Sequence, residues 1–144
     1  MHIFLGLEGY LGVGSKWRKI TSELEPMINA RVCEITHPAF DSIAVISIIM
    51  PEEYLADYKE RDYLSRKDRY ADIRLHVNWK EFTCSSEQKR SRLYVEHLID
   101  SIQRMERKMK TKEERAAFDE LKTAICSVSD EYLSKTERGE DHGK

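Results

Sequence analysis

The sequence predicts an α+β fold, with a mostly antiparallel sheet of four to five strands, one helix after the first strand and a C-terminal helical hairpin packed on the sheet. Three observations support this fold class. Strand-like segments fill the first half of the chain, one segment of helical period follows the first strand, and apolar stripes of helical period fill the last third. At 144 residues the chain is long enough to bury one core. We therefore expect a single domain over residues 1–135, followed by a polar, frayed tail at residues 136–144.

The first strand and the helix after it are predicted near the N-terminus. Residues 2–7 are apolar and aromatic and end at a glycine-rich turn. From Ser15, an expected N-cap, apolar side chains recur at steps of three and four, which is the spacing of one helical face. Pro26 falls inside this pattern, so we expect it to kink or divide the helix. The apolar face consists of Trp17, Ile20, Leu24, Met27 and Ile28.

Strands are predicted through the middle of the chain. Residues 31–36 form a short expected strand before a proline, and residues 42–50 are almost continuously β-branched, which is typical of a strand buried on both faces. Residues 58–65 and 70–79 then form a hairpin with a polar tip at 66–68. The return strand alternates strictly, with Ala71, Ile73, Leu75, Val77 and Trp79 on one face and Tyr70, Asp72, Arg74, His76 and Asn78 on the other.

The last third of the chain predicts two helices. Ser85 with Gln88 fits a capping box that opens the first helix, and Thr111 with Glu114 fits a second one. Two successive helices with a short connection pack as an antiparallel hairpin. The two apolar stripes are Tyr94, Leu98, Ile102, Met105 and Met109, then Phe118, Leu121, Ile125, Val128 and Tyr132.

Composition and the cysteines narrow the class of protein. The net charge of −2 argues against a protein that coats nucleic acid in general, which would be basic overall. The three cysteines, Cys33, Cys84 and Cys126, are widely spaced, so neither a disulfide framework nor a zinc site is supported. The N-terminus lacks the basic region of a signal peptide. We therefore expect a soluble protein of the cytoplasm.

Motifs for catalysis and cofactor binding are absent from the sequence. The segment 9–16 resembles a phosphate-binding loop, but Ser15 and Lys16 stand in the reverse order to the one that loop needs. The five histidines show no metal-binding spacing, and no serine lies in a GxSxG elbow. We therefore expect no cofactor, no metal and no catalytic residues. A small enzyme with a dispersed active site remains an alternative, because such sites are recognised only in space.

Charge is distributed unevenly along the chain. Residues 1–60 carry a net charge of −4, residues 61–115 carry +5, and residues 116–144 carry −3. The acidic cluster Glu52, Glu53, Asp57 and Glu60 is either a solvated loop or a surface that attracts a basic partner. The polar face of the strand 70–79 is likewise either the wet side of a sheet or a recognition face.

Several segments resemble a family of bacterial immunity proteins. The most specific is Ala71-Asp72-Ile73-Arg74-Leu75-His76, preceded by Tyr58-Lys59-Glu60-Arg61 and followed by Phe82 and the helix around Leu98 to Ile102. The first strand, the helix with Trp17 and the strand before Pro51-Glu52 are also similar to that family, so that the resemblance covers about residues 2–125. Pro26 and Asn78-Trp79 depart from the family pattern, and the departures fall on the local surface.

The resemblance implies a function in binding. Such proteins are encoded beside polymorphic and contact-dependent growth-inhibition toxins, and each neutralises its cognate toxin's C-terminal domain, often a nuclease, in the cytoplasm. On this basis we expect a toxin-binding surface that includes Glu52, Glu53, Asp57, Glu60, Tyr63, Asp72 and Arg74. The alternative is a small RNA-binding module that uses the basic segment 61–115 and its aromatic side chains.

Overall fold

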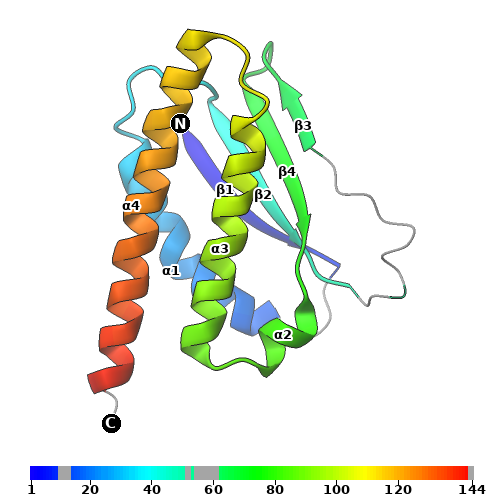
Figure 1. Cartoon of the computed structure of the whole chain (residues 1–144), viewed down its shortest axis with the longest axis vertical. Coiled ribbons are helices and arrows are strands. Elements are labelled where there is room, and N and C mark those ends of the chain that lie inside the picture. Colours follow the sequence, from blue (N-terminus) through cyan, green and yellow to red (C-terminus); the bar gives the residue numbers. More distant parts are fainter. Residues whose placement is uncertain (10–13, 51–52, 54–61, 143–144) are drawn as a thin grey trace.

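The fold is an α+β arrangement of four strands and four helices within the part of the chain that the structure describes (Figure 1). The computed structural model describes residues 1–9, 14–50, 53 and 62–142. The elements, in chain order, are β1 (His2–Glu8), α1 (Gly14–Val32), β2 (Ser42–Ile48), β3 (Asp62–Ser65), β4 (Tyr70–His76), α2 (Trp79–Cys84), α3 (Glu87–Glu106) and α4 (Lys112–His142).

The sheet is mixed, so the prediction of a mostly antiparallel sheet is wrong. Its order is β1-β2-β4-β3, and only the β3–β4 pair is antiparallel. The helix α1 lies between β1 and β2 in the chain and returns it to the same end of the sheet, which makes these two strands parallel. β4 also pairs with β2 in parallel. β3 forms an antiparallel hairpin with β4 and occupies the edge of the sheet. The sequence showed the hairpin clearly but carried no local signal for the order of the other strands.

The helix α1 is continuous from Gly14 to Val32 and is not divided at Pro26. Pro26 is exposed, so water can solvate the carbonyl group that its missing N–H leaves unpaired. The strand expected at residues 31–36 is also wrong, because the buried stripe of α1 runs on through Ile28 and Val32, both of which are fully buried.

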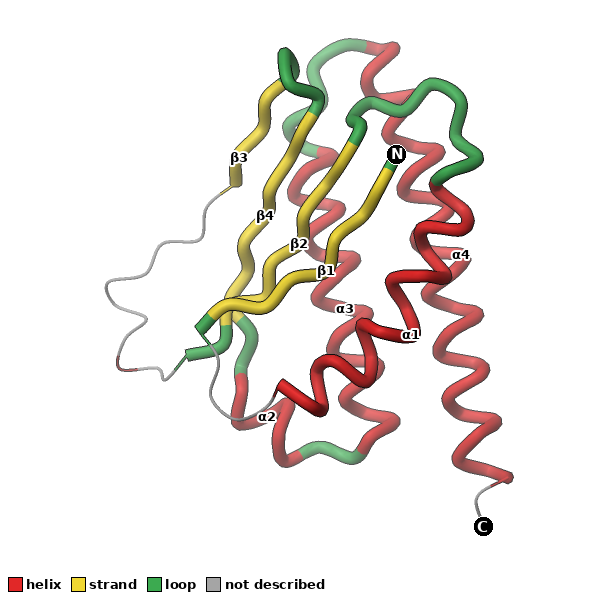
Figure 2. The backbone as a smooth tube through the Cα atoms, turned by 180° about the vertical axis from the view of Figure 1, so that it is seen from behind, coloured by secondary structure: helices red, strands yellow, loops and turns green. Residues whose placement is uncertain are grey.

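The outer edge of β1 is covered by side chains of α1. The Asn29 side chain accepts a hydrogen bond from the Ile3 N–H at 2.8 Å and donates one to the Ile3 carbonyl at 2.9 Å. The Glu25 carboxylate accepts from the Leu5 N–H at 2.9 Å. Figure 2 shows α1 running beside this edge of the sheet. Two side chains therefore occupy the backbone groups that an exposed edge strand would offer to another chain.

The hairpin of β3 and β4 confirms the alternation seen in the sequence. Ala71, Ile73 and Leu75 are buried, whereas the residues between them are partly exposed. Arg69 in the connecting turn has a positive φ of 53°. β4 ends at His76, earlier than expected, because Asn78 caps the short helix α2 by accepting from the Glu81 N–H at 3.1 Å.

The C-terminal helices follow the predicted helical hairpin, with one shift in a cap. Ser86 rather than Ser85 caps α3, accepting from the Lys89 N–H at 3.2 Å. Thr111 accepts from the Glu114 N–H at 3.0 Å at the start of α4, as expected. α4 then continues to His142 and so includes most of residues 136–144, for which the sequence predicts a frayed tail.

The core lies between the sheet and the helices. α3 and α4 pack together over one face, α1 packs on α4 and β1, and the apolar side of every strand points toward them (Figures 1 and 2). The opposite face of the sheet carries no helix among the described residues. The most deeply buried large side chains include Ile3, Leu24, Phe40, Ile43, Ile73, Phe82, Leu98 and Phe118.

Candidate functional site

The helix-free side of the sheet, here called the open face, gathers side chains from all four strands. Alternate residues of a strand point to opposite faces, and the register aligns Phe4 of β1 with Ala44, Asp72 and Tyr63 in one row. The next row aligns Gly6 with Ile46 and Arg74. Residues that lie far apart in the sequence therefore form one continuous surface on rigid elements.

Two aromatic side chains stand out on the open face. Phe4 is 51% exposed and Tyr63 is 56% exposed, and they are the exposed large hydrophobic side chains among the described residues. The rings of Tyr63 and Tyr70 lie 6.2 Å apart. A Cβ atom on Gly6 would lie 2.7 Å from the Phe4 ring and 2.5 Å from Ile46, so both side chains close over this glycine. The absence of a side chain at Gly6 thus lets Phe4 and Ile46 form an apolar patch over β1 and β2.

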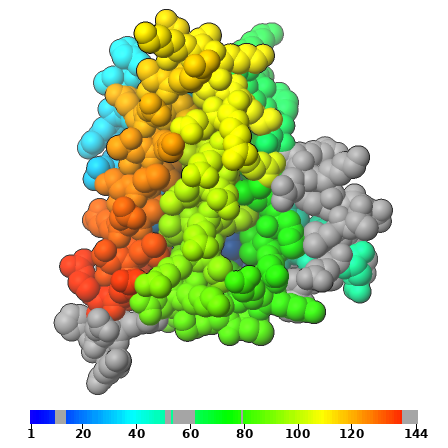
Figure 3. Space-filling model, viewed as in Figure 1, coloured from blue at the N-terminus to red at the C-terminus, as the bar shows by residue number. Residues whose placement is uncertain are grey.

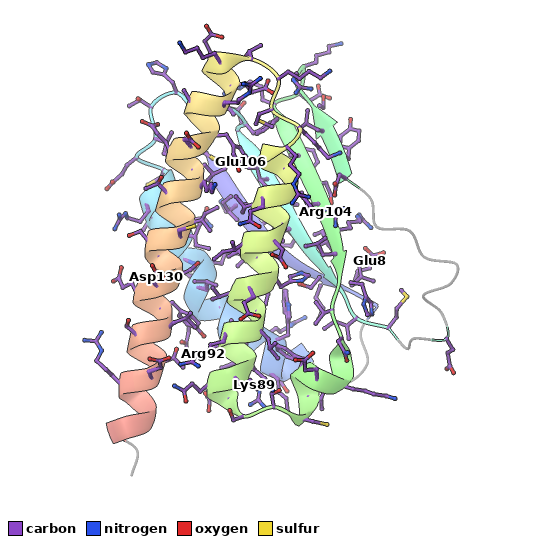
Figure 4. The ribbon with its side chains drawn as sticks, in the orientation of Figure 1. Glu8, Lys89, Arg92, Arg104, Glu106 and Asp130 are labelled. Atoms are coloured by element: carbon purple, nitrogen blue, oxygen red, sulfur yellow. The ribbon has the colours of Figure 1, made fainter. Side chains whose placement is uncertain are left out.

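A chain of polar contacts crosses the same face. Arg74 bonds the Glu8 carboxylate at 2.5 Å and lies 3.4 Å from the Asp72 carboxylate. The Tyr70 hydroxyl donates to Asp72 at 3.3 Å. Burial, followed by the neighbouring Asp72 charge, raises the pKa of Tyr70, so its hydroxyl keeps its proton at neutral pH. These contacts hold the charged groups in fixed orientations beside the aromatic rings (Figure 4, where Glu8 is labelled).

The structure brings together three of the seven expected site residues. Tyr63 and Asp72 are direct partners in the β3–β4 register, and Arg74 contacts Asp72. Glu53 is exposed. The other three expected residues, Glu52, Asp57 and Glu60, lie outside the described residues.

Sequence reasoning missed Phe4 and Glu8 as members of this face. The alternation of His2, Phe4, Gly6 and Glu8 was present, but a strand pattern alone does not say which strands are neighbours. Only the parallel β1–β2 pairing places Glu8 near Arg74.

A second feature is a pocket of about 270 Å³ at the carboxyl end of β4, between α2 and α3. Its lining includes His76 and His97 together with three carboxylates, which is the kind of pocket that the enzyme alternative requires. The lining residues are Trp17, His76, Val77, Asn78, Glu81, Phe82, Leu93, Tyr94, Glu96, His97 and Asp100.

His97 in this pocket is not arranged as a catalytic base for a serine. Ser47 Oγ lies 3.2 Å from His97 Nε2, but Ser47 is fully buried, so no substrate can reach its hydroxyl. Burial, and then the neighbouring His76 and Arg104, lower the pKa of His97 to about 4. Across the described residues, no group of three His, Cys, Asp or Glu side chains could hold a metal ion.

Several basic side chains of residues 61–115 form ion pairs with carboxylates. Arg104 bonds Asp62 at 2.7 Å, and Arg66 bonds Glu114 at 2.7 Å. Further pairs are Arg69 with Asp41, Arg92 with Glu137, and Lys108 with Asp62. These pairs reduce the number of cations that the RNA-binding alternative would offer to phosphates.

Exposed aromatic rings and an oriented arginine on the open face are side chains of the kinds that are enriched at the energetic centres of protein–protein interfaces. The family model of immunity protein 44 matches residues 1–140, and the chain therefore belongs to the immunity protein 44 family. This match confirms the resemblance to bacterial immunity proteins noted in the sequence. No curated protein and no solved structure matches the chain. Within the described residues, no helix has the length and apolar character needed to cross a membrane.

Proposed function

We propose that this protein binds and neutralises the C-terminal domain of a cognate toxin, a nuclease, in the cytoplasm of the cell that makes the toxin. Membership of the immunity protein 44 family supports the toxin as the class of partner. We place the toxin-binding surface on the open face. One observation supports this choice: Phe4 and Tyr63 are more than half exposed there, beside the contacts of Arg74 with Glu8 and Asp72.

The open face suits tight and specific capture of another protein. Aromatic side chains provide large contact areas at low entropic cost, and they dominate the energetics of many interfaces. The ion pairs of Arg74 fix the orientation of its side chain in the free protein, so binding a partner costs little further side-chain entropy. A surface built on strands is also more rigid than one built on loops.

The acidic cluster Glu52, Glu53, Asp57 and Glu60 belongs to this proposal as the group that speeds association. A nuclease carries basic groups for its nucleic-acid substrate, and an acidic surface on the immunity protein raises the rate of encounter with them. Asp72 and Glu8 add acidic groups on the open face itself.

The experiment that tests the proposal measures binding to the toxin domain encoded beside this gene. Tyr63→Ala and Phe4→Ala should each weaken binding by about 30-fold, which corresponds to about 2 kcal/mol for an anchor residue. Lys89→Ala and Asp130→Ala, which alter exposed positions on α3 and α4, serve as controls and should bind like the unmodified chain. If the controls weaken binding and the open-face variants do not, the proposed surface is wrong.

Gly6→Ala gives a separate test of the open face. The new methyl group would displace the Phe4 ring and the Ile46 side chain, both of which are flexible ends rather than backbone. We expect stability to change by less than about 1 kcal/mol, because the atoms that must move are ends of side chains on the open face, while toxin binding weakens. Urea unfolding and calorimetric titration separate the two effects, and unchanged binding with a displaced ring would contradict the role of this patch.

A further inference from the structure

The pocket between α2 and α3 has an unusually one-sided charge. Glu81, Glu96 and Asp100 line it, and no lysine or arginine is among its lining residues. None of these three carboxylates forms an ion pair or a side-chain hydrogen bond with the described part of the chain. Glu96 and Asp100 lie four residues apart on α3, where two like charges repel each other. The pocket therefore gathers negative charge that the described residues leave uncompensated.

The wall of the pocket contains buried polar groups without partners. Trp17 is 5% exposed and its indole Nε1 has no hydrogen-bond acceptor, and Tyr94 is 2% exposed and its hydroxyl is also unpaired. The two rings pack edge to face with centroids 6.2 Å apart. An indole N–H can only donate, so a group that fills the pocket would satisfy it with an oxygen acceptor. Leaving such a group unpaired costs about 1–3 kcal/mol.

The size of the pocket fits a single side chain better than a cofactor. Its volume of about 270 Å³ is below the range of about 300–1,000 Å³ that is typical of small-molecule sites. In Figure 3, atoms of the N-terminal part of the chain, coloured blue, are visible in a hollow between α3 and β4. The lowered pKa of His97 keeps this side chain neutral at pH 7, so it adds no positive charge to the pocket.

The pocket continues from the open face around the end of β4. His76 lines the pocket and follows Arg74 of the open face by two residues in β4. His76 is also in register with Ile48 of β2, and through it with Glu8 of β1. A partner that covers the Glu8–Arg74 end of the open face would thus reach the rim of the pocket.

We propose that this pocket receives an arginine side chain of the toxin, whose guanidinium group bonds Glu96 and Asp100 while a neighbouring peptide carbonyl accepts from the Trp17 indole. The proposal rests on the proposed function, because it takes the toxin as the source of the arginine. A guanidinium group offers five N–H donors in a planar fork that matches carboxylates, and its flat face packs well on aromatic rings. Its charge compensates carboxylates that have no cation of their own.

The test uses the full chain and Nα-acetyl-L-argininamide as the probe. The resonance of the Trp17 indole N–H is followed by NMR, after its assignment with Trp17→Phe. We expect a saturable shift with a dissociation constant of about 1–10 mM, the affinity of a small isolated anchor. Nα-acetyl-L-citrullinamide, which has the same shape without the charge, should bind at least about fivefold more weakly if the carboxylates recognise the cation.

A matched pair of double variants identifies the groups responsible. Glu96→Gln with Asp100→Asn should abolish the saturable shift, whereas Asp130→Asn with Glu131→Gln removes the same charge from exposed positions on α4 and should leave it unchanged. The absence of a saturable shift, an equal response to the citrulline probe, or equal effects of the two double variants would each overturn the proposal.

Binding to the toxin domain separates this inference from the proposed function. We expect the Glu96 and Asp100 double variant to weaken toxin binding by about tenfold, as for one charged contact of an interface. If this variant binds the toxin normally while Tyr63→Ala does not, the pocket inference fails and the proposed function stands. If the unmodified chain binds no toxin, both fail, even where the probe occupies the pocket.

Discussion

Single residues acquire their roles here from neighbours that the sequence does not reveal. The alternation of the strand 70–79 correctly placed Asp72 and Arg74 on the polar side, because a period of two follows from strand geometry alone. That Arg74 contacts Glu8 depends on strand order, for which no local pattern exists. His97 is a similar case, since its helical position said nothing about Ser47 or His76 beside it.

The lowered pKa of His97 predicts how stability depends on pH. The unfolded chain protonates this histidine below about pH 6.5, whereas the folded protein resists protonation until about pH 4, because burial, His76 and Arg104 oppose the charge. The unfolded state therefore binds more protons within this window, and stability falls as the pH is lowered from about 6.5 to about 4. The loss attributable to His97 should be about 3 kcal/mol, because its pKa falls from 6.5 to about 4 and each unit of pKa corresponds to 1.36 kcal/mol.

Urea unfolding at a series of pH values measures this effect. His97→Gln should flatten the pH dependence over the window, while His37→Gln, at an exposed histidine, should leave the slope as it is. An NMR titration of His97 with a midpoint near pH 6.5 would contradict the prediction.

Whole elements were predicted best where the signal is local. The caps and apolar stripes identified α3 and α4, and Thr111 caps α4 as expected. α2 was missed because Val77 and Trp79 continue the alternation of β4, while the cap at Asn78 ends the strand earlier. The mixed sheet was missed for a non-local reason, since the parallel pairing of β1 and β2 depends on how α1 packs back on the sheet.

The link between α1 and the edge of β1 predicts a stability effect. Asn29→Ala removes two hydrogen bonds to Ile3 and leaves partly buried backbone groups unpaired, so we expect a loss of about 1–3 kcal/mol. Urea unfolding should show a lower midpoint with an unchanged m-value. Ser22→Ala, at an exposed position of the same helix, is the control and should change stability by less than about 0.5 kcal/mol. Equal stabilities of the two variants would show that the edge contacts contribute nothing.

At the scale of the whole molecule, the helices cover one face of the sheet, and no helix among the described residues covers the other (Figure 2). The overall charge of −2 is the sum of an acidic N-terminal part, a basic middle part and an acidic C-terminal part, and ion pairs within the fold neutralise some of the cations of the middle part. The sequence therefore predicted the family and three residues of the open face, Tyr63, Asp72 and Arg74, whereas the continuity of this face depends on the strand order.

The acidic cluster leads to a prediction about association. Charge reversal of Glu52, Glu53, Asp57 and Glu60 to lysine should slow association with the toxin domain and make its rate less sensitive to salt, because long-range attraction to a basic nuclease is lost. Stopped-flow kinetics at several salt concentrations measure both quantities. An unchanged rate with an unchanged salt dependence would remove these four residues from the site.

The central claim is that this protein acts by occupying its toxin, and a titration of toxin activity tests it most directly. The purified toxin domain is assayed at a concentration well above the expected dissociation constant while the full chain is added. Toxin activity should fall linearly and reach zero at an equimolar ratio, as in tight stoichiometric inhibition. Full toxin activity in the presence of excess chain would contradict the account.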